Sequence, residues 1–452
     1  MHLHASTSIQ DSKGGRDVLH VDIDGNRGPV VCAAQMNPIS SSSGMMDGRY
    51  AGLVGHTGPV SALALSQTQG SSIIVQQPVL ASASEDGTVK IWDIDSRSVV
   101  RTVDALPLLE STATAAAAAA ASDDGSNVAA NDGPAAICFA WNSSDLLYVS
   151  VGASLLLCDL RSSDSRPWVH VFDAADDINK IDAHWNGSYV ALADDSGSVH
   201  VLETAATPHK PYRKLRKAHT NIATSVCFRP KRPWQLWSSS MDYSVIHWDY
   251  SKGSISESYK YDPLPQTNIE SDSLFAQGLN PPFGYDLKFN STGNTCVVAL
   301  GDGSIDCIQW NSDDHGSRLS KKASQSLRKA NRSTVCRQRL SGPHAWSATA
   351  VSFAPKLEQS NDAMDMFVSA SIDGSVALWS VPPTSSGTTV SEDAAPPLPP
   401  LRSTIKLAQK INTVVALDTS ESRVLVAIGS TAKSGARTAV DAFEIELACL
   451  DL

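Results

Sequence analysis

Short alternations of apolar and polar residues recur along this chain of 452 residues. The clearest pair lies in Leu80–Asp93, where serines alternate with small apolar residues before Asp86-Gly87, and Thr88–Trp92 alternates again after it. Two alternating runs joined by Asp-Gly predict a β-hairpin. An isolated hairpin is only marginally stable in water, so we expect other hairpins of the same chain to cover its apolar faces.

The hairpin pattern repeats with a fixed spacing. Three strong units share a histidine ahead of an apolar strand, an aspartate at a turn, and a tryptophan six residues after that aspartate: His56, Asp86 and Trp92; His219, Asp242 and Trp248; His344, Asp373 and Trp379. Weaker copies, with an aliphatic residue in place of the tryptophan, occur at Ser196-Gly197 and Asp302-Gly303. A repeat of this kind resembles the four-stranded blade of a WD-repeat β-propeller.

The chain supplies strands for seven such blades. The last blade has only three, near Thr413–Leu417, Val424–Ile428 and Val440–Ile445, while Tyr50–Val54 is an extra strand ahead of the first blade. Pairing the N-terminal strand with the C-terminal blade would remove two exposed sheet edges. We therefore predict an all-β, seven-bladed WD-repeat β-propeller that is closed by this pairing.

Segments of different composition flank and interrupt the predicted propeller, which extends over residues 49–448. Residues 1–48 are polar and rich in serine and glycine, a composition typical of disorder. Insertions are expected at residues 105–134, 262–280, 311–332 and 380–402. The first contains the alanine tract Ala115–Ala121, and the last is rich in proline and serine.

Composition and charge exclude several classes of protein. There is no run of eighteen apolar residues, so no membrane-spanning helix is predicted. Met1–Arg16 lacks the apolar core of a secretory signal, and the eight cysteines are scattered without a Cys-x-x-Cys pair. We therefore expect reduced thiols and a location in the cytoplasm and/or nucleus. A formal net charge of −11 argues against general affinity for nucleic acid.

Serine, histidine and aspartate occur together in the strong units, which raises the question of catalysis. Ser82 or Ser84 could be drawn into a hydrolase triad with His56 and Asp86. The corresponding serines recur in the other two units: Ser238 and Ser240; Ser369 and Ser371. Because an enzyme needs one nucleophile, we expect structural hydrogen bonds from Trp through Ser and His to Asp instead. We predict no enzyme, and no catalytic, cofactor-binding or metal-binding residue.

A longer match narrows the resemblance. The run His219–Pro233, which ends in Arg-Pro-Lys-Arg-Pro, resembles the WD repeat-containing protein 53 family, as do Ala193–Gly197, Asp159–Ser162 and Gly278–Pro281. The resemblance implies a non-enzymatic scaffold, of the substrate-receptor kind that docks on the damage-binding adaptor of a cullin-4 ubiquitin ligase through Trp-Asp-x-Arg. The best match to that motif here is Cys158–Arg161, with cysteine in place of tryptophan.

Asp159 and Arg161 are accordingly the candidate docking residues. The planar guanidinium of Arg161 could reach a carboxylate or carbonyl of a partner. Alternatively, Arg161 could close a local ion pair with Asp159 or Asp164. The partners expected from this hypothesis are other proteins, namely the ligase adaptor and a client, with no membrane, and the propeller is expected to be a monomer within a larger complex.

Two basic stretches suggest a second hypothesis. Lys210–Lys217, on a predicted outer strand, is interpreted as charged protection of a sheet edge. Arg318–Arg339 carries eight basic residues and no acid, so this loop could bind phosphate in a nucleic-acid-associated assembly factor. The stretch lacks aromatic residues that stack on bases, which favours the protein-binding scaffold.

Overall fold

The computed structural model describes most of the unit Gly48–Leu452, one of two into which the chain divides. The residues described are 51–66, 79–94, 96–105, 133–141, 143–162, 167–213, 215, 217–262, 280–310, 335–355, 365–381, 401–419, 423–431 and 443–451. The predictions for residues 1–48 and for Ala115–Ala121 lie outside them.

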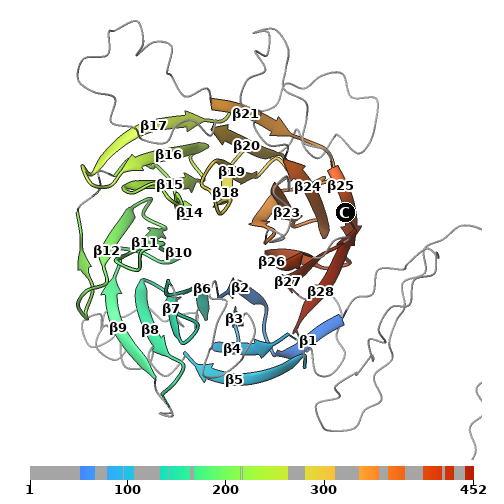
Figure 1. The fold of residues 1–452 in the computed structure, drawn as a ribbon, viewed down its shortest axis with the longest axis horizontal. Coiled ribbons are helices and arrows are strands. Elements are labelled where there is room, and N and C mark those ends of the chain that lie inside the picture. The colour runs from blue at the N-terminus through green and yellow to red at the C-terminus, as the bar shows by residue number, and fades with distance from the viewer. Residues whose placement is uncertain are drawn as a thin grey trace, which may run out of the picture. The chain divides into compact units, whose positions relative to one another are not determined.

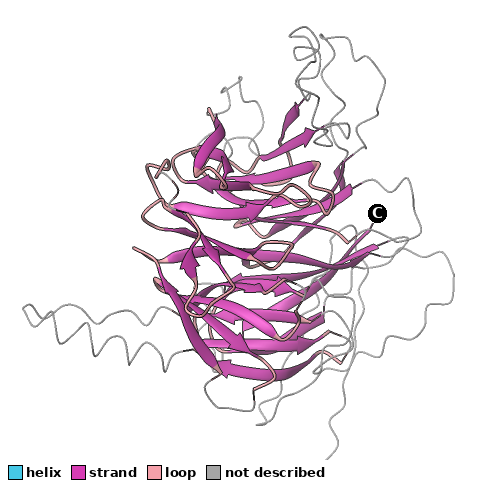
Figure 2. Cartoon of the chain, turned by 60° about the vertical axis from the view of Figure 1, so that its left-hand side comes forward, coloured by secondary structure: helices cyan, strands magenta, loops and turns pink. Residues whose placement is uncertain are grey.

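All regular elements in these ranges are β-strands, and they form seven four-stranded antiparallel sheets (Figures 1 and 2). Blades 1 to 3 are β2 (Val60–Leu65), β3 (Leu80–Ser84), β4 (Thr88–Asp93) and β5 (Ser98–Asp104); β6 (Pro134–Phe139), β7 (Leu146–Val151), β8 (Ser154–Asp159) and β9 (Trp168–Asp173); and β10 (Ile178–Ala183), β11 (Tyr189–Asp194), β12 (Val199–Glu203) and β13 (Lys210–Pro211). Blades 4 to 6 are β14 (Ala223–Phe228), β15 (Gln235–Ser240), β16 (Ser244–Asp249) and β17 (Ser254–Lys260); β18 (Gly284–Phe289), β19 (Thr295–Leu300), β20 (Ile305–Trp310) and β21 (Val335–Leu340); and β22 (Ala348–Phe353), β23 (Asp365–Ser371), β24 (Ser375–Val381) and β25 (Leu401–Lys406).

The remaining sheet joins the two ends of the unit. It contains β26 (Lys410–Thr419), β27 (Arg423–Thr431) and β28 (Phe443–Asp451), with β1 (Ala51–His56) as its fourth strand. β1 pairs antiparallel with β28, so that Leu53 lies opposite Ile445. The prediction of an all-β propeller is confirmed. Strands reach further than expected, because β6 begins at Pro134, inside a predicted insertion, and β28 continues to Asp451; proline is tolerated at the first position of a strand.

The position of a strand within its blade explains its residue pattern. β19 is buried along its whole length because neighbouring blades cover both of its faces, and it reads as a continuous run of mostly apolar residues. β17, the outermost strand of blade 4, is exposed at nearly every position and is rich in serine and charged residues. Burial is therefore lower in the outermost strand than in an inner strand. Figure 1 shows the order of the strands from the inside of the propeller to the outside.

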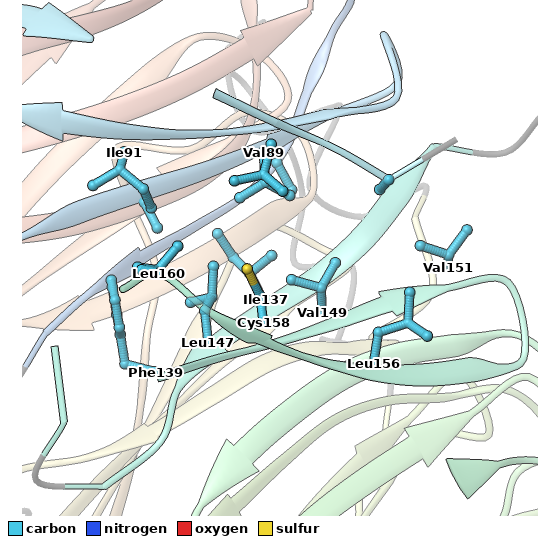
Figure 3. Close-up of a cluster of buried hydrophobic side chains, with 14 of the residues drawn as sticks. Val89, Ile91, Ile137, Phe139, Leu147, Val149, Val151, Leu156, Cys158 and Leu160 are labelled. Carbon is cyan, nitrogen blue, oxygen red and sulfur yellow. The ribbon is translucent and has the colours of Figure 1, made fainter. Parts of the chain in front are cut away.

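Neighbouring blades enclose clusters of apolar side chains. Figure 3 shows one of them, in which Val89 and Ile91 of blade 1 face Ile137, Val149 and Leu156 of blade 2. Every pair of successive blades encloses such a cluster, including blades 7 and 1. Truncating one fully buried leucine to alanine costs about 2–5 kcal/mol, so these clusters are the main source of stability.

A bulge near the start of the first strand links most blades to the next. In five blades the bulged residue is polar, and its side chain donates a hydrogen bond to a backbone carbonyl at the start of the first strand of the following blade. These five bonds run from Ser61 to Pro134, Asn179 to Ala223, Thr224 to Gly284, Thr349 to Ile411 and Asn412 to Val60. A β-bulge inserts one extra residue into a strand and turns its side chain away from the regular alternation of the sheet. Because the bonds join start to start, these first strands run in the same direction.

This shared direction gives the blades two distinct faces. We call the face with the turns from first to second and from third to fourth strand the turn face. The opposite face carries the turns from second to third strand and the connections between blades, and we call it the connection face. Asp86 and Trp346 lie on the connection face, whereas Arg161 and Trp234 lie on the turn face.

Candidate functional site

The repeated histidine, serine, aspartate and tryptophan residues form connected hydrogen-bond chains. In blade 1 the indole Nε1 of Trp92 donates to Ser82 Oγ at 2.7 Å, and His56 Nε2 lies 2.7 Å from the same oxygen. His56 Nδ1 lies 3.0 Å from Asp86 Oδ2. These hydrogen bonds therefore connect the third strand, the second strand and the turn of blade 1 to the last residue of β1, which belongs to the sheet of β26, β27 and β28.

Blade 4 repeats this arrangement, and blade 6 varies it. In blade 4 Trp248 donates to Ser238 at 2.9 Å, and His219 bridges Ser238 and Asp242. In blade 6 the histidine Nδ1 lies 2.6 Å from Ser375 Oγ, and the hydroxyl of Ser375 in turn donates to Asp373. The nine residues predicted for these networks are thus brought together blade by blade: His56, Asp86 and Trp92; His219, Asp242 and Trp248; His344, Asp373 and Trp379.

Electrostatics hold the turn aspartates in their charged form. Burial alone would raise the pKa of Asp86, but hydrogen bonds from His56 and Thr88 outweigh it and keep the pKa well below its usual value. The pKa of Asp373 falls to about 2, since hydrogen bonds from Ser375 likewise outweigh burial. Burial lowers the pKa of His344 to about 4, so this histidine is neutral at physiological pH.

The geometry of these chains fits a structural role. Ser82 and His56 are 0% and 1% exposed, and the serine oxygen is already occupied by the indole of Trp92. The second serine of each pair bonds to the backbone instead, as Ser84 does with the carbonyl of Gly58. A nucleophile that no substrate can reach, repeated in three blades, serves to join strands.

Two aspartates, Asp302 in the turn of blade 5 and Asp194 at the strand end just before the turn of blade 3, have partners that the sequence did not indicate. In blade 3 His200 Nε2 lies 2.9 Å from Asp194 Oδ2, although this histidine comes from the third strand. In blade 5 Arg339, on the outermost strand β21, pairs with Asp302. A histidine or arginine side chain therefore meets an aspartate near the turn in these blades also, but it comes from a different strand each time, and only the fold reveals it.

The candidate docking residues Asp159 and Arg161 form a local ion pair at the turn from β8 to β9. Arg161 donates from Nε to Asp159 Oδ1 at 2.9 Å and from Nη2 to Oδ2 at 2.7 Å. The side chain of Arg161 is 50% exposed, and that of Asp159 is 38% exposed. The hydrogen bonds from Arg161 lower the pKa of Asp159. Asp159 and Arg161 thus form an ion pair with two hydrogen bonds, and both side chains stay accessible on the turn face.

An arginine of the neighbouring blade holds this turn in place. Arg101, on β5 of blade 1, donates to the carbonyls of Leu160 and Ser162, the second of them at 2.6 Å from Nη2. These two carbonyls flank Arg161 in sequence. The position of the docking candidate is therefore fixed by a contact between blades, which sequence reasoning did not identify.

Cys158 replaces tryptophan inside the blade and leaves the surface of the turn unchanged. Its side chain is 0% exposed, and burial raises the pKa of its thiol to about 12. At the equivalent position of the strong blades, Trp92, Trp248 and Trp379 are also buried and bond to serines. The cysteine therefore removes a hydrogen-bond chain from blade 2 and takes no group away from the exposed turn.

The basic stretch Arg318–Arg339 is not one loop. Its last two arginines lie on β21, where Arg337 Nε is 2.7 Å from Asp306 and Arg339 pairs with Asp302. Both aspartates are about 1% exposed and need a counter-charge, which explains why these arginines face inward. The prediction of a basic loop over the whole stretch is wrong at this end, and residues 311–334 lie outside the described part.

The described residues carry no other group that suggests chemistry. None of their histidines, cysteines, aspartates and glutamates gather in a set of three or more that could hold a metal ion. Across the same ranges we find no helix of the length and apolar character needed to cross a membrane. The thiols of six cysteines are unpaired: Cys138, Cys158, Cys227, Cys296, Cys307 and Cys336.

Comparison with known proteins relates the chain to other propellers. The family described as "WD domain, G-beta repeat" matches residues 49–93 and 210–249. The WD repeat-containing protein 53 homolog of Dictyostelium discoideum is 27% identical over 242 residues, 51% of this chain and 58% of that protein. Nucleoporin Nup43 of Mus musculus is 24% identical over 198 residues, 43% of this chain and 45% of that protein. The chain thus spans about half the length of these curated relatives.

A solved structure supports the same fold. The β-propeller domain of Cps50 (Swd1) from Myceliophteria thermophila has a TM-score of 0.56 at 12% identity, with coverage of 88% of this chain and 99% of that chain. This similarity shows the fold alone. Together with the repeated Trp–Ser–His chains, these findings show that the chain carries WD repeats on a β-propeller fold.

Proposed function

We propose that this protein is a substrate-receptor-like scaffold that docks on the damage-binding adaptor of a cullin-4 ubiquitin ligase through the turn of Asp159 and Arg161. Propellers of the WD-repeat family are generally non-enzymatic scaffolds, and the buried serines of this chain fit that role. The observation that carries the finer proposal is the exposed, bidentate pair of Asp159 and Arg161 on a turn of blade 2 that Arg101 of blade 1 holds in place.

The chemistry of the fork suits recognition of a partner. Nε and Nη2 of Arg161 are used by Asp159, and Nη1 has no partner among the described residues. A guanidinium that is already oriented loses little side-chain entropy when it binds a carbonyl or carboxylate of another protein. Arginine is also enriched among the residues that dominate binding energy at interfaces.

The test measures binding of the purified adaptor to the full chain by biolayer interferometry. We expect Arg161→Ala to weaken binding about tenfold or more, equivalent to about 1.4 kcal/mol, and Arg161→Lys to restore little because lysine has no planar fork. Lys252→Ala is the matched control, since Lys252 pairs with Asp249 at 2.5 Å on the equivalent turn of blade 4. Unchanged binding by Arg161→Ala, or an equal loss with Lys252→Ala, contradicts the proposal.

We also propose that the seven sheets form one closed ring. Pairing of β1 with β28, the apolar cluster between blades 7 and 1, and the bond from Asn412 to Val60 support closure. The alternative function, a nucleic-acid-associated assembly factor, has less support because Arg337 and Arg339 are engaged with aspartates. A cytoplasmic and/or nuclear location and a monomeric propeller within a larger complex remain part of the proposal.

A further inference from the structure

A tryptophan lies exposed on the turn face of blade 4. Trp234, in the turn from β14 to β15, is 39% exposed. Its indole is stacked on Tyr212 of blade 3, with 6.2 Å between ring centroids, and is tilted against Tyr250, with 5.5 Å between centroids. Tyr189 also contacts the ring, at 6.2 Å. The tryptophan is therefore held by aromatic neighbours in a fixed orientation while much of its surface stays open.

The turn that carries Trp234 is firmly anchored. Arg229 at its base is 2% exposed, donates from Nε to the carbonyl of Gly293 at 2.7 Å, and places its guanidinium 4.1 Å from the ring centroid of Trp310. Its Nη1 donates to Gln235 on the other side of the turn at 2.9 Å. Exposure of Trp234 is consequently a property of an ordered turn.

Two residues of this turn adopt a backbone conformation that glycine would prefer. Lys231 has a φ of 57° and Trp234 a φ of 72°. Such a conformation costs roughly 1–3 kcal/mol for a residue with a side chain and persists where the surrounding structure imposes it. A large aromatic residue at positive φ on the surface is an unfavourable choice for stability alone, which directs attention to binding.

Cations surround this aromatic patch. Four described basic residues lie within three positions of Tyr212 or Trp234 in the sequence: Lys210, Arg213, Lys231 and Arg232. Two acids lie beside the same rings: Glu203, opposite Lys210 in the pairing of β12 with β13, and Asp249, which precedes Tyr250 and is paired with Lys252. The local charge is thus positive on a chain whose net charge is −11, so the patch differs in sign from the molecule as a whole.

We propose that Trp234 and its cationic surroundings bind an acidic peptide segment of a client protein, which inserts one apolar side chain against the exposed indole. An aromatic anchor beside lysines and arginines is complementary to an apolar residue flanked by aspartates or glutamates. Single-stranded nucleic acid fits less well, because Tyr212 already covers one face of the indole and successive bases need successive open rings.

This inference rests on the proposed scaffold role but does not involve Arg161. The patch would hold the client, and the blade 2 turn would hold the adaptor. The experiment below uses the purified full chain without adaptor, so a negative result leaves docking at Arg161 untouched, and loss of adaptor docking leaves this patch untouched.

The test selects peptides of about twelve residues from a random display library on the immobilised full chain. We expect recovered sequences to be rich in aspartate and glutamate around one apolar residue. A labelled peptide from this set, followed by fluorescence anisotropy, should bind about tenfold more weakly to Trp234→Gly and to the double variant Lys231→Glu, Arg232→Glu. Trp234→Phe should retain most of the affinity.

The variants separate binding from folding. Glycine suits the φ of 72° at position 234, so Trp234→Gly keeps the turn while it removes the indole. Trp346→Ala is the control for loss of an exposed tryptophan, because Trp346 is 53% exposed on the connection face. The affinity of this variant for the peptide should not change. The proposal would be overturned if the library yielded no peptide, or only neutral or basic peptides. Equal recovery of peptides on Trp234→Gly, or competition by oligouridine for the patch, would also overturn it.

Discussion

The side-chain amide of Asn412 donates a hydrogen bond to the carbonyl of Val60, 3.1 Å away and 352 positions earlier in the chain. The same kind of bond runs from Thr349 to Ile411, between blades that are consecutive in sequence. In both cases the donor is the bulged residue of a first strand. The junction between the last and the first blade is therefore built like a junction in the middle of the chain.

This equivalence predicts the cost of breaking the junction. Asn412→Ala should lower the free energy of unfolding by about 1 kcal/mol, the net contribution of one such hydrogen bond, measured by urea denaturation. Thr349→Val is the matched control because it removes the same bond at an internal junction, and it should cost about as much. If Asn412→Ala were neutral while Thr349→Val destabilised the protein, blades 7 and 1 would not be joined in solution.

The turn aspartate of blade 1 should matter more than any single bond between blades. Asp86 accepts hydrogen bonds from the His56 ring, from the backbone of Thr57 and from both the backbone and the hydroxyl of Thr88. Asp86→Ala leaves these donors unpaired in a site where the carboxylate is only 6% exposed, and we expect a loss of about 3 kcal/mol.

Thermal unfolding followed by circular dichroism measures this loss. Asp176→Ala, at an exposed position on the same face of blade 3, should have little effect. A change at Asp86 no larger than at Asp176 would show that the chain from Trp92 to Asp86 contributes nothing to stability.

Stability should fall as the solution is acidified, in two stages. The folded pKa of His344 is about 4 against an ordinary value of 6.5, so below pH 6.5 the unfolded chain binds a proton that the folded chain does not. Stability is lost on going from pH 6.5 to 4, by up to roughly 3 kcal/mol. Below pH 4 the turn aspartates add a second loss, because their folded pKa values lie below the ordinary 3.8 and that of Asp373 is about 2.

Urea denaturation at a series of pH values tests the first stage. His344→Asn removes the titrating ring, so the variant should be less stable at pH 7 but should lose less stability between pH 6.5 and 4 than the original chain. Parallel curves for the two proteins over that range would rule out His344 as the cause.

Local patterns predicted much of this fold, whereas contacts between distant strands were hidden. Alternation and the Asp-Gly turn located β3 and β4 to within one residue. Ser82 and Ser84 could not be told apart, because alternation puts both on one face of the strand; only the fold shows that the indole of Trp92 reaches the first. The histidine or arginine that contacts an aspartate near this turn, by contrast, comes from the third strand in blade 3 and from the outermost strand in blade 5.

The candidate site shows the same limit. Asp159 and Arg161 were found from a motif of adjacent residues, and the short loop between them made their pairing one of two stated alternatives. Arg101 lies 61 positions before Ser162, and no local pattern links the two. The exposure of Trp234 depends on Arg229 and Trp310 of two different blades, which sequence spacing does not reveal.

The clamp formed by Arg101 gives the last prediction. Its guanidinium spans the carbonyls of Leu160 and Ser162, so Arg101→Ala should free the turn that carries Arg161 without touching Arg161 itself. We expect faster amide hydrogen exchange at residues 159–162 and adaptor binding about fivefold weaker, because the fork must be ordered on binding. Arg101→Lys should rescue little, since one ammonium group cannot span both carbonyls as the fork does. Arg97→Ala, at the turn from β4 to β5 of blade 1, is the control and should change neither quantity. Faster exchange with unchanged affinity would mean that docking does not need an ordered turn, and unchanged exchange would mean that the clamp does not order it.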